Sequence, residues 1–246
     1  MSLDIKQKLI VALDMDTRAE AERLVEVLAP YVGAFKVGMQ LYNSEGPDMV
    51  RSLMDRGAKV FVDLKFHDIP NTVVQAGRVM TRLGVFMYNL HVAGGSEMMR
   101  QTVEATRKEA EALGLNPPLL LGVTVLTSIT DHQLREEMGV ERNLTEQVVK
   151  WAQLAQEAGL NGVVASPQEI QAIRQACGSE FIIVTPGVRP AGAQLNDQKR
   201  VMTPGEAIMA GASFLVVGRP ITAAADPVAA TKAIVEEMEK AAVVAN

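Results

Sequence analysis

The stretch Phe61-Val-Asp-Leu-Lys-Phe-His-Asp-Ile-Pro-Asn-Thr72 leads from an apolar strand toward a helix and carries two carboxylates and an ammonium group. Because side chains alternate between the two faces of a strand, Asp63 and Lys65 project to one side, opposite Val62. Asp68 follows just past the strand end. A buried lysine flanked by carboxylates stays protonated, so this spacing predicts a proton donor held in a fixed position.

A structural interpretation of the same charges stays open at this point. Ion-pair networks outside active sites perturb charged groups in a similar way. In that interpretation the charges form a salt-bridge network at the strand end, and Asp68 or Asn71 caps a helix that Pro70 begins.

A unit of one short apolar run and one segment of helical period repeats along the chain. The predicted strands are Leu9–Met15, Ala34–Met39, Lys59–Lys65, Val85–His91, Leu119–Thr127, Gly162–Ser166, Phe181–Thr185 and Phe214–Gly218. The predicted helices are Ala19–Leu28, Pro47–Arg56, Val73–Leu83, Glu97–Leu113, Thr145–Ala158, Pro167–Gln175, Thr203–Ala210 and Pro227–Ala241. Strands and helices in alternation indicate a parallel sheet.

Eight such units fill 246 residues without a linker or a low-complexity tract. A single (β/α)8 barrel typically has about 250 residues. The G-x-G-x-x-G signature of a dinucleotide-binding, doubly wound sheet is missing after the first strand. The sequence therefore predicts an α/β protein in which residues 1–246 form a single (β/α)8 TIM barrel domain.

The composition of the chain limits which partners and which cellular compartment we expect. The net charge is −5 and there is no basic run, so we expect no nucleic-acid partner. Charged residues interrupt any apolar segment near the N-terminus, and no uncharged stretch is long enough to span a bilayer. The single cysteine, Cys177, cannot form an intrachain disulfide. We therefore expect a cytoplasmic protein without a membrane partner.

Polar residues gather where the predicted strands end. In a barrel of this type the reactive residues lie at the carboxyl ends of the strands. Those ends carry Asp14, Lys36, Asp63, Lys65, His91, Thr127, Ser128, Arg189 and Arg219. So many polar groups converging on one face indicate a functional site. For His91 alone we expect a hydrogen-bonded structural role, since neutral buried histidines are common.

The last two strands end in a pattern typical of a phosphate site. The final predicted strand ends at Gly218, and Arg219 follows it, where barrels of this class commonly bind phosphate. A planar guanidinium group donates two parallel hydrogen bonds to a phosphate. The connection 186–203 carries Arg189 and Gln198, and we expect it to close over the phosphate as a lid. The alternative is a solvated surface loop.

Several motifs together identify a family. They are Asp63-Leu-Lys-Phe-His-Asp-Ile-Pro-Asn-Thr72, Lys36, Thr185-Pro-Gly-Val-Arg189, Asp197-Gln-Lys-Arg200 and Val217-Gly-Arg-Pro220. In these motifs, from the first strand to the last, the chain resembles the bacterial orotidine 5′-monophosphate decarboxylases. The resemblance implies loss of carbon dioxide from carbon 6 of the orotate ring, the last step of de novo UMP synthesis, without a metal or an organic cofactor.

The resemblance also implies residue roles. Lys65 is expected to protonate carbon 6, within a Lys-Asp-Lys-Asp array formed with Lys36, Asp63 and Asp68. Asp68 and Thr72 are expected to enter the site of a partner chain, which implies a two-fold homodimer with shared sites. The other implied substrate contacts are Asp14 and Lys36 at the ribose, Thr127 at the pyrimidine edge, and Arg189, Gln198, Gly218 and Arg219 at the phosphate.

Two other functions stay open. A Mg²⁺-dependent sugar-phosphate decarboxylase of the same barrel type, such as 3-keto-L-gulonate 6-phosphate decarboxylase, shares the Asp-x-Lys-x-x-Asp strand but needs an acidic metal ligand near the second strand. That strand carries Lys36, and no acid follows before Glu45. A non-catalytic phosphoribosyl-binding barrel would keep Gly218 and Arg219 but has no need for Lys65 between two carboxylates.

Overall fold

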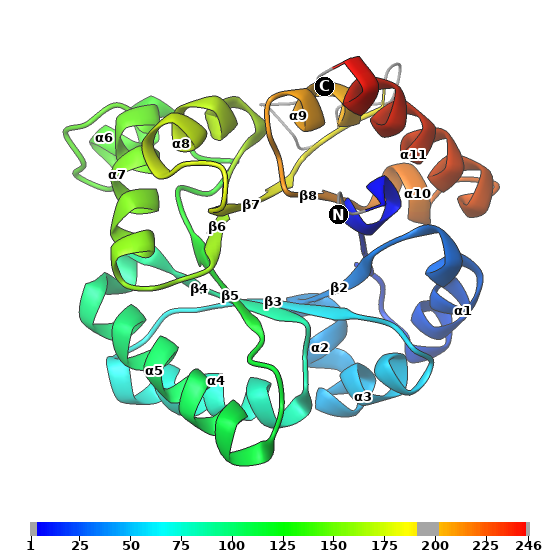
Figure 1. The fold of residues 1–246 in the computed structure, drawn as a ribbon, viewed down its shortest axis with the longest axis horizontal. Coiled ribbons are helices and arrows are strands. Elements are labelled where there is room, and N and C mark those ends of the chain that lie inside the picture. Colours follow the sequence, from blue (N-terminus) through cyan, green and yellow to red (C-terminus); the bar gives the residue numbers. More distant parts are fainter. Residues whose placement is uncertain (1–3, 191–201, 245–246) are drawn as a thin grey trace.

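In the computed structural model, which describes residues 4–190 and 202–244, parallel strands close into a barrel in sequence order (Figure 1). The strands are β1 (Leu9–Ala12), β2 (Ala34–Gly38), β3 (Val60–Phe66), β4 (Met87–His91), β5 (Leu119–Val123), β6 (Gly162–Val164), β7 (Ile182–Pro186) and β8 (Phe214–Val217). The barrel closes where β1 pairs with β8, with Ile10 opposite Val216. The predicted (β/α)8 barrel is therefore confirmed.

Helices connect successive strands and surround the barrel in Figure 1. They are α1 (Arg18–Leu28), α2 (Met39–Glu45), α3 (Pro47–Asp55), α4 (Pro70–Leu83), α5 (Gly95–Leu113), α6 (Asp131–Glu136), α7 (Leu144–Glu157), α8 (Ile170–Cys177), α9 (Pro204–Met209), α10 (Arg219–Thr222) and α11 (Pro227–Val244). Short 3₁₀ helices lie at Ile5–Lys8, Ala29–Tyr31, Val92–Gly94 and Pro167–Glu169. Each predicted helix is present, while the short helices α2, α6 and α10 were not predicted.

The start of α4 decides one of the alternatives left open by the sequence. The helix begins at Pro70, three residues before the predicted start at Val73. Ile69 occupies the N-cap position, and its side chain makes no capping hydrogen bond. The Oδ1 atom of Asp68 instead accepts a hydrogen bond from the N–H of Ile69 at 2.7 Å. The interpretation in which Asp68 or Asn71 caps this helix is therefore wrong.

The barrel wall separates two apolar layers. Side chains from alternate strand positions fill the interior, namely Ile10, Ala12, Ala34, Phe61, Met87, Leu121, Val184, Phe214 and Val216. The outward side chains, including Val60 and Val62, pack under the helices. Phe61 points inward and its two neighbours point outward, so the alternation predicted around Asp63 is confirmed.

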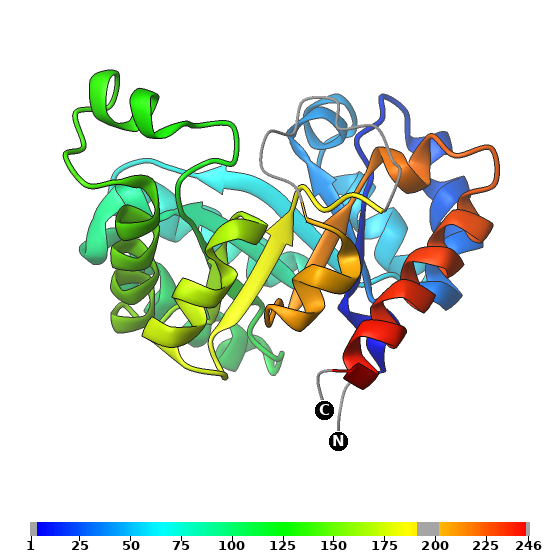
Figure 2. The same ribbon diagram turned by 90° about the horizontal axis from the view of Figure 1, so that it is seen from above.

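The interior becomes polar toward the carboxyl ends of β2, β3 and β4. Lys36, Asp63 and Asn89 continue the inward-facing rows that begin with Ala34, Phe61 and Met87. Asp63 contacts both Lys36 and Asn89. In Figure 2 the arrowhead of β7 points to this end of the barrel, where α6 also lies. Within the described residues, no helix is both long enough and apolar enough to cross a bilayer.

Candidate active site

A row of alternating charges crosses the carboxyl ends of the first three strands. The Nζ atom of Lys36 lies 2.9 Å from Asp14 Oδ1 and 3.5 Å from Asp63 Oδ2. The Nζ atom of Lys65 lies 2.7 Å from Asp63 Oδ1. Each carboxylate therefore has an ammonium neighbour, and the formal charges of these four groups cancel.

Asp63 is the central member of this row, and its side chain is 13% exposed. Burial raises the pKa of a carboxyl group, because the charged form loses its hydration. The ammonium groups of Lys36 and Lys65 and the hydrogen bonds from Lys65 and Asn89 outweigh burial and hold the pKa of Asp63 below its ordinary value. Asp63 is therefore ionised and pairs with two cations at once.

Lys65 has a left-handed backbone conformation, with φ at 54°, and is the sole non-glycine residue with positive φ in the described ranges. The pairing of β3 with β4 shifts register in this segment, between Val62 and Phe66. Asn89 on β4 bridges the irregularity, because its Oδ1 accepts from the backbone N–H of Lys65 at 2.8 Å and its Nδ2 donates to Asp63 Oδ1 at 2.7 Å. This fully buried residue was not predicted as part of the site from the sequence.

The fourth charge of the predicted array is not brought to the row by the same chain. Asp68 and Thr72 are both exposed, and among the described residues Asp68 contacts Ile69 and forms no ion pair with Lys65. The side chain of Ile69 is 67% exposed. The segment after β3 thus presents a carboxylate, a hydroxyl group and a large apolar side chain to the outside.

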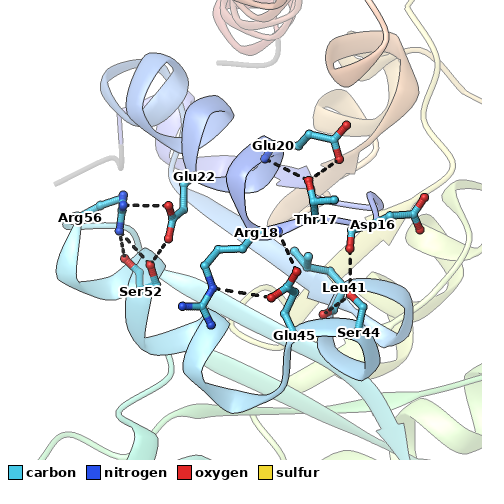
Figure 3. Close-up of polar contacts among 10 residues, drawn as sticks. All are labelled: Asp16, Thr17, Arg18, Glu20, Glu22, Leu41, Ser44, Glu45, Ser52 and Arg56. Atoms are coloured by element: carbon cyan, nitrogen blue, oxygen red, sulfur yellow. Dashed lines mark hydrogen bonds and ion pairs between the residues drawn. The ribbon is translucent and has the colours of Figure 1, made fainter.

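Two hydrogen bonds join the segment that follows Asp14 to α2. The Oγ atom of Ser44 donates to the carbonyl oxygen of Asp16 at 3.1 Å. The backbone N–H of Arg18 donates to Glu45 Oε1 at 3.1 Å (Figure 3). These bonds hold the chain two and four residues after Asp14, whose own side chain is 55% exposed.

A cavity of about 320 Å³ opens beside the charged row. Its lining residues are Lys36, Phe61, Asp63, Lys65, Val123, Val125, Leu126, Thr127, Ser128, Val164, Ala165, Pro186 and Val216. Thr127 thus lies at the same cavity as Lys65, as the sequence predicted. A largely apolar cavity with a few convergent polar groups is typical of a small-molecule site.

Two arginines lie near the ends of β7 and β8. Arg189 is 8% exposed, and its Nε atom has no hydrogen-bond partner in the part of the chain that the structure describes. Burial, and then the positive charge of Arg219, lowers the pKa of Arg189. Arg219 and Asp14 line a second cavity, of about 670 Å³, and a Cβ atom at Gly218 would lie 3.8 Å from Asp14 Oδ2. Two adjacent guanidinium groups with an unused donor suit an anion.

His91 ends β4 beside the charged row, and its ring centroid lies 5.3 Å from that of His67. Burial, together with the charges of His67 and Lys65, lowers the pKa of His91 against an opposing effect of Asp63. The contact that the structure gives the His91 ring is with His67, so its hydrogen-bonded structural role stays a prediction. Gln198 and the centre of the predicted lid lie outside the described residues.

Fold and site together define a (β/α)8 barrel of the enzyme type, with a charged row and an arginine pair at the carboxyl ends of its strands. Residues 7–234 match the family model described as "Orotidine 5'-phosphate decarboxylase / HUMPS family". The chain belongs to this family.

Individual relatives agree with the family match over nearly the whole chain. Orotidine 5′-phosphate decarboxylase of Syntrophomonas wolfei is 58% identical over 239 residues, which cover 97% of this chain and 100% of the relative. The protein of the same name from Moorella thermoacetica is 58% identical, with 95% of this chain and 93% of the relative covered. The crystal structure of orotidine 5′-phosphate decarboxylase from Lactobacillus acidophilus has a TM-score of 0.83 at 39% identity, covering 94% of this chain and 98% of that chain. The resemblance found in the sequence is therefore confirmed.

Proposed function

We propose that the protein converts orotidine 5′-monophosphate to UMP and carbon dioxide in de novo pyrimidine biosynthesis, without a metal or an organic cofactor. The observation that carries the proposal is the ammonium group of Lys65, held 2.7 Å from an ionised Asp63 at the wall of the 320 Å³ cavity. Relatives that are 58% identical over nearly the full chain bear the name of this activity.

The chemistry explains why a fixed ammonium group is needed. The bond between carbon 6 and its carboxylate breaks, and the electron pair stays on carbon 6 in the ring plane, where the π system cannot delocalise it. The protein must therefore stabilise the carbanion electrostatically. An ammonium group about 4 Å away contributes on the order of 4 kcal/mol at an effective dielectric constant near 20. Lys65 then transfers a proton to carbon 6, and solvent reprotonates its amine.

The remaining predicted residues form the proposed binding site for the rest of the nucleotide. Asp14 accepts hydrogen bonds from the ribose hydroxyl groups, with Lys36 beside it at 2.9 Å. Thr127 binds the edge of the pyrimidine ring from the wall of the same cavity as Lys65. The phosphate is held by Gly218, Arg219, Arg189 and Gln198. Binding energy from this remote phosphate closes the lid and excludes water.

We further propose a cytoplasmic homodimer in which Asp68 and Thr72 complete the active site of the partner chain. Both side chains are exposed, and within the described residues Asp68 forms no ion pair with the charged row of its own chain. The side chain of Lys65 is still 25% exposed, so a second carboxylate has access to it from outside. The exposed Ile69 between them gives a partner an apolar contact.

Mixing Lys65→Ala chains with Asp68→Asn chains tests the shared site. Each variant alone is expected to be nearly inactive. In a mixed dimer one site carries both defects and the other carries neither, so random reassortment restores about a quarter of all sites. Differently tagged chains show whether subunits exchange. Exchanged but inactive mixtures would mean that Asp68 acts within its own chain.

Turnover in the presence of EDTA separates the proposed function from its two rivals. We expect orotidine 5′-monophosphate to lose its absorbance at the same rate with and without the chelator. A Mg²⁺-dependent sugar-phosphate decarboxylase would show no such turnover and would need metal for its own substrate. A non-catalytic barrel would bind the nucleotide without converting it.

A further inference from the structure

Asn89 ties together the two residues on which the proposed proton transfer depends. Its single amide contacts the backbone of Lys65 at 2.8 Å and the carboxylate of Asp63 at 2.7 Å. The Lys65 ammonium group contacts the same carboxylate oxygen, Asp63 Oδ1, also at 2.7 Å. Backbone, amide, carboxylate and ammonium group thus form a closed ring of hydrogen bonds.

The orientation of the Asn89 amide follows from the two groups that it contacts. A backbone N–H can only donate, so it needs the amide oxygen, and a carboxylate can only accept, so it needs the amide nitrogen. Asn89 is 0% exposed, so water cannot replace either contact. Within the described chain no other side chain offers a donor and an acceptor to this pair of residues.

The ring of hydrogen bonds holds Lys65 in a strained backbone conformation. A non-glycine residue at positive φ is strained and persists only where its surroundings hold it in place. Lys65 has a φ of 54° and lies in the segment where the register between β3 and β4 shifts. The amide oxygen of Asn89 accepts the hydrogen bond from its backbone N–H and so stabilises this conformation. That conformation turns the Lys65 side chain toward the cavity of the proposed reaction.

We propose that Asn89 is a positioning residue, which holds the left-handed backbone of Lys65 and the Asp63 carboxylate in the geometry for proton transfer to carbon 6. The inference rests on the proposed function. Asn89 does not line the 320 Å³ cavity, so it acts through Lys65 and Asp63 and makes no contact with the substrate.

Two substitutions at this position separate the roles of the amide. Asn89→Asp keeps the acceptor for Lys65 but loses the donor to Asp63, while Asn89→Leu loses both at nearly the same volume. The matched control is Tyr88→Phe at the preceding residue of the same strand, whose side chain lies on the outer face of the barrel wall. It removes a buried hydrogen bond of 2.6 Å to Thr106.

For Asn89→Leu we expect kcat to fall roughly a hundredfold, because a small displacement of a reacting group costs about that much. KM should change less than about threefold, since the ribose and phosphate contacts come from other residues. Tyr88→Phe should keep the wild-type kcat. A kcat of Asn89→Leu equal to that of Tyr88→Phe would overturn the proposal.

The pH profile of Asn89→Asp gives a readout that a purely structural role would not move. Two adjacent carboxylates bind a proton at higher pH than a single carboxylate does, because each repels the charge of the other. Acidification should therefore protonate the pair that Asp63 forms with the substituted side chain and restore a hydrogen-bond donor. The ratio of the variant's kcat to that of wild type should rise as the pH falls. The other ionisable groups around position 89 are Lys36, Lys65, His67 and His91, which wild type and Tyr88→Phe retain. A constant ratio of Asn89→Asp to wild-type kcat across pH would overturn the proposal, including when Asn89→Leu fails to fold.

A measurement without substrate keeps this inference distinct from the proposed function. Carbon NMR of the Asp63 carboxylate should show a higher pKa in Asn89→Asp than in wild type, because one hydrogen bond to the ionised form is replaced by a like charge. Lack of turnover by wild type would refute the proposed function. An unchanged titration of Asp63 would refute the role of Asn89.

Discussion

The two charged regions at the mouth of the barrel differ in how their charges are satisfied. On β1 to β4, two carboxylates and two ammonium groups alternate at distances of 2.7–3.5 Å. Asn89 donates a hydrogen bond to one of these carboxylates, that of Asp63. Near β7 and β8, Arg189 and Arg219 carry the same sign of charge, and burial and repulsion lower the pKa of Arg189. The four charges of the first region pair with one another within the chain, while the two arginines of the second region suit an added anion.

This difference separates catalysis from binding. A preorganised row of charges needs no rearrangement when the transition state forms, which is the condition for strong electrostatic stabilisation. Two neighbouring positive charges repel each other until a dianion binds between them. Their favourable interaction energy is therefore released when the phosphate binds. Under the proposed function, the first three strands supply the reacting geometry and the last two supply the affinity.

Removing the ammonium group of Lys65 should have the largest effect and should strike the catalytic region alone. In Lys65→Ala we expect kcat to fall about a thousandfold or more, because both the proton donor and its charge are lost. The affinity for UMP should change less than about threefold, since the arginine pair is intact. Steady-state kinetics and calorimetric titration with UMP measure the two quantities.

Lys59→Ala is the matched control for that variant. Lys59 precedes the same strand, is exposed and lies 5.5 Å from the Phe86 ring centroid, far from the charged row in the strand direction. It should retain wild-type kcat and affinity. If Lys65→Ala kept more than about a tenth of the rate, a loss of less than roughly 1.4 kcal/mol, Lys65 would not be the proton donor.

Removing Arg189 should have the opposite effect to removing Lys65, because it should weaken phosphate binding. Arg189→Met is expected to weaken phosphate binding about tenfold to a hundredfold, the usual range for hydrogen bonds to charged groups. Thermal unfolding with inorganic phosphate should show a rise in Tm for wild type and Lys65→Ala and little or no rise for Arg189→Met. Without phosphate, the variant should be at least as stable as wild type, because it lacks a buried cation whose Nε atom has no partner among the described residues. An undiminished phosphate shift would remove Arg189 from the anion site.

A methyl group at Gly38 should give the smallest effect and tests how tightly the charged row is packed. Its Cβ atom would lie 2.9 Å from Lys36 Nζ and 3.1 Å from Asp14 Oδ1. Gly38 has φ at −91°, which alanine accepts, so the fold should survive. We expect kcat/KM of Gly38→Ala to fall about threefold to tenfold as Lys36 is displaced. Unchanged kcat/KM at unchanged Tm would show that the row has room to adjust.

The fold could be predicted from the sequence because each strand of a parallel barrel is buried on both faces and reads as a short apolar run. The short helices could not. In α2 just one side chain, Leu41, is buried, so no helical period is visible, and α6 is too brief to show one. Tertiary contacts, not periodicity, determine these two segments.

The site could be predicted where local alternation fixes which way a side chain points. Asp63 and Lys65 share a face for that reason, and the structure places both at one cavity. Asn89 occupies an inward position two residues before His91, so the same alternation could have found it. Its double contact depends on the register shift between β3 and β4 and on the left-handed Lys65, which no local pattern reveals.

The ladder between β1 and β8 couples synthesis of β8 to completion of the site. Pairing of Leu9 with Leu215 is among the longest-range contacts in the molecule, and such contacts form slowly. Until β8 has been synthesised, β1 is an open sheet edge, and Asp14 lacks Gly218 and Arg219 beside it. In a refolding or newly made chain, affinity for phosphate should therefore appear later than secondary structure, and its onset reports closure of the barrel.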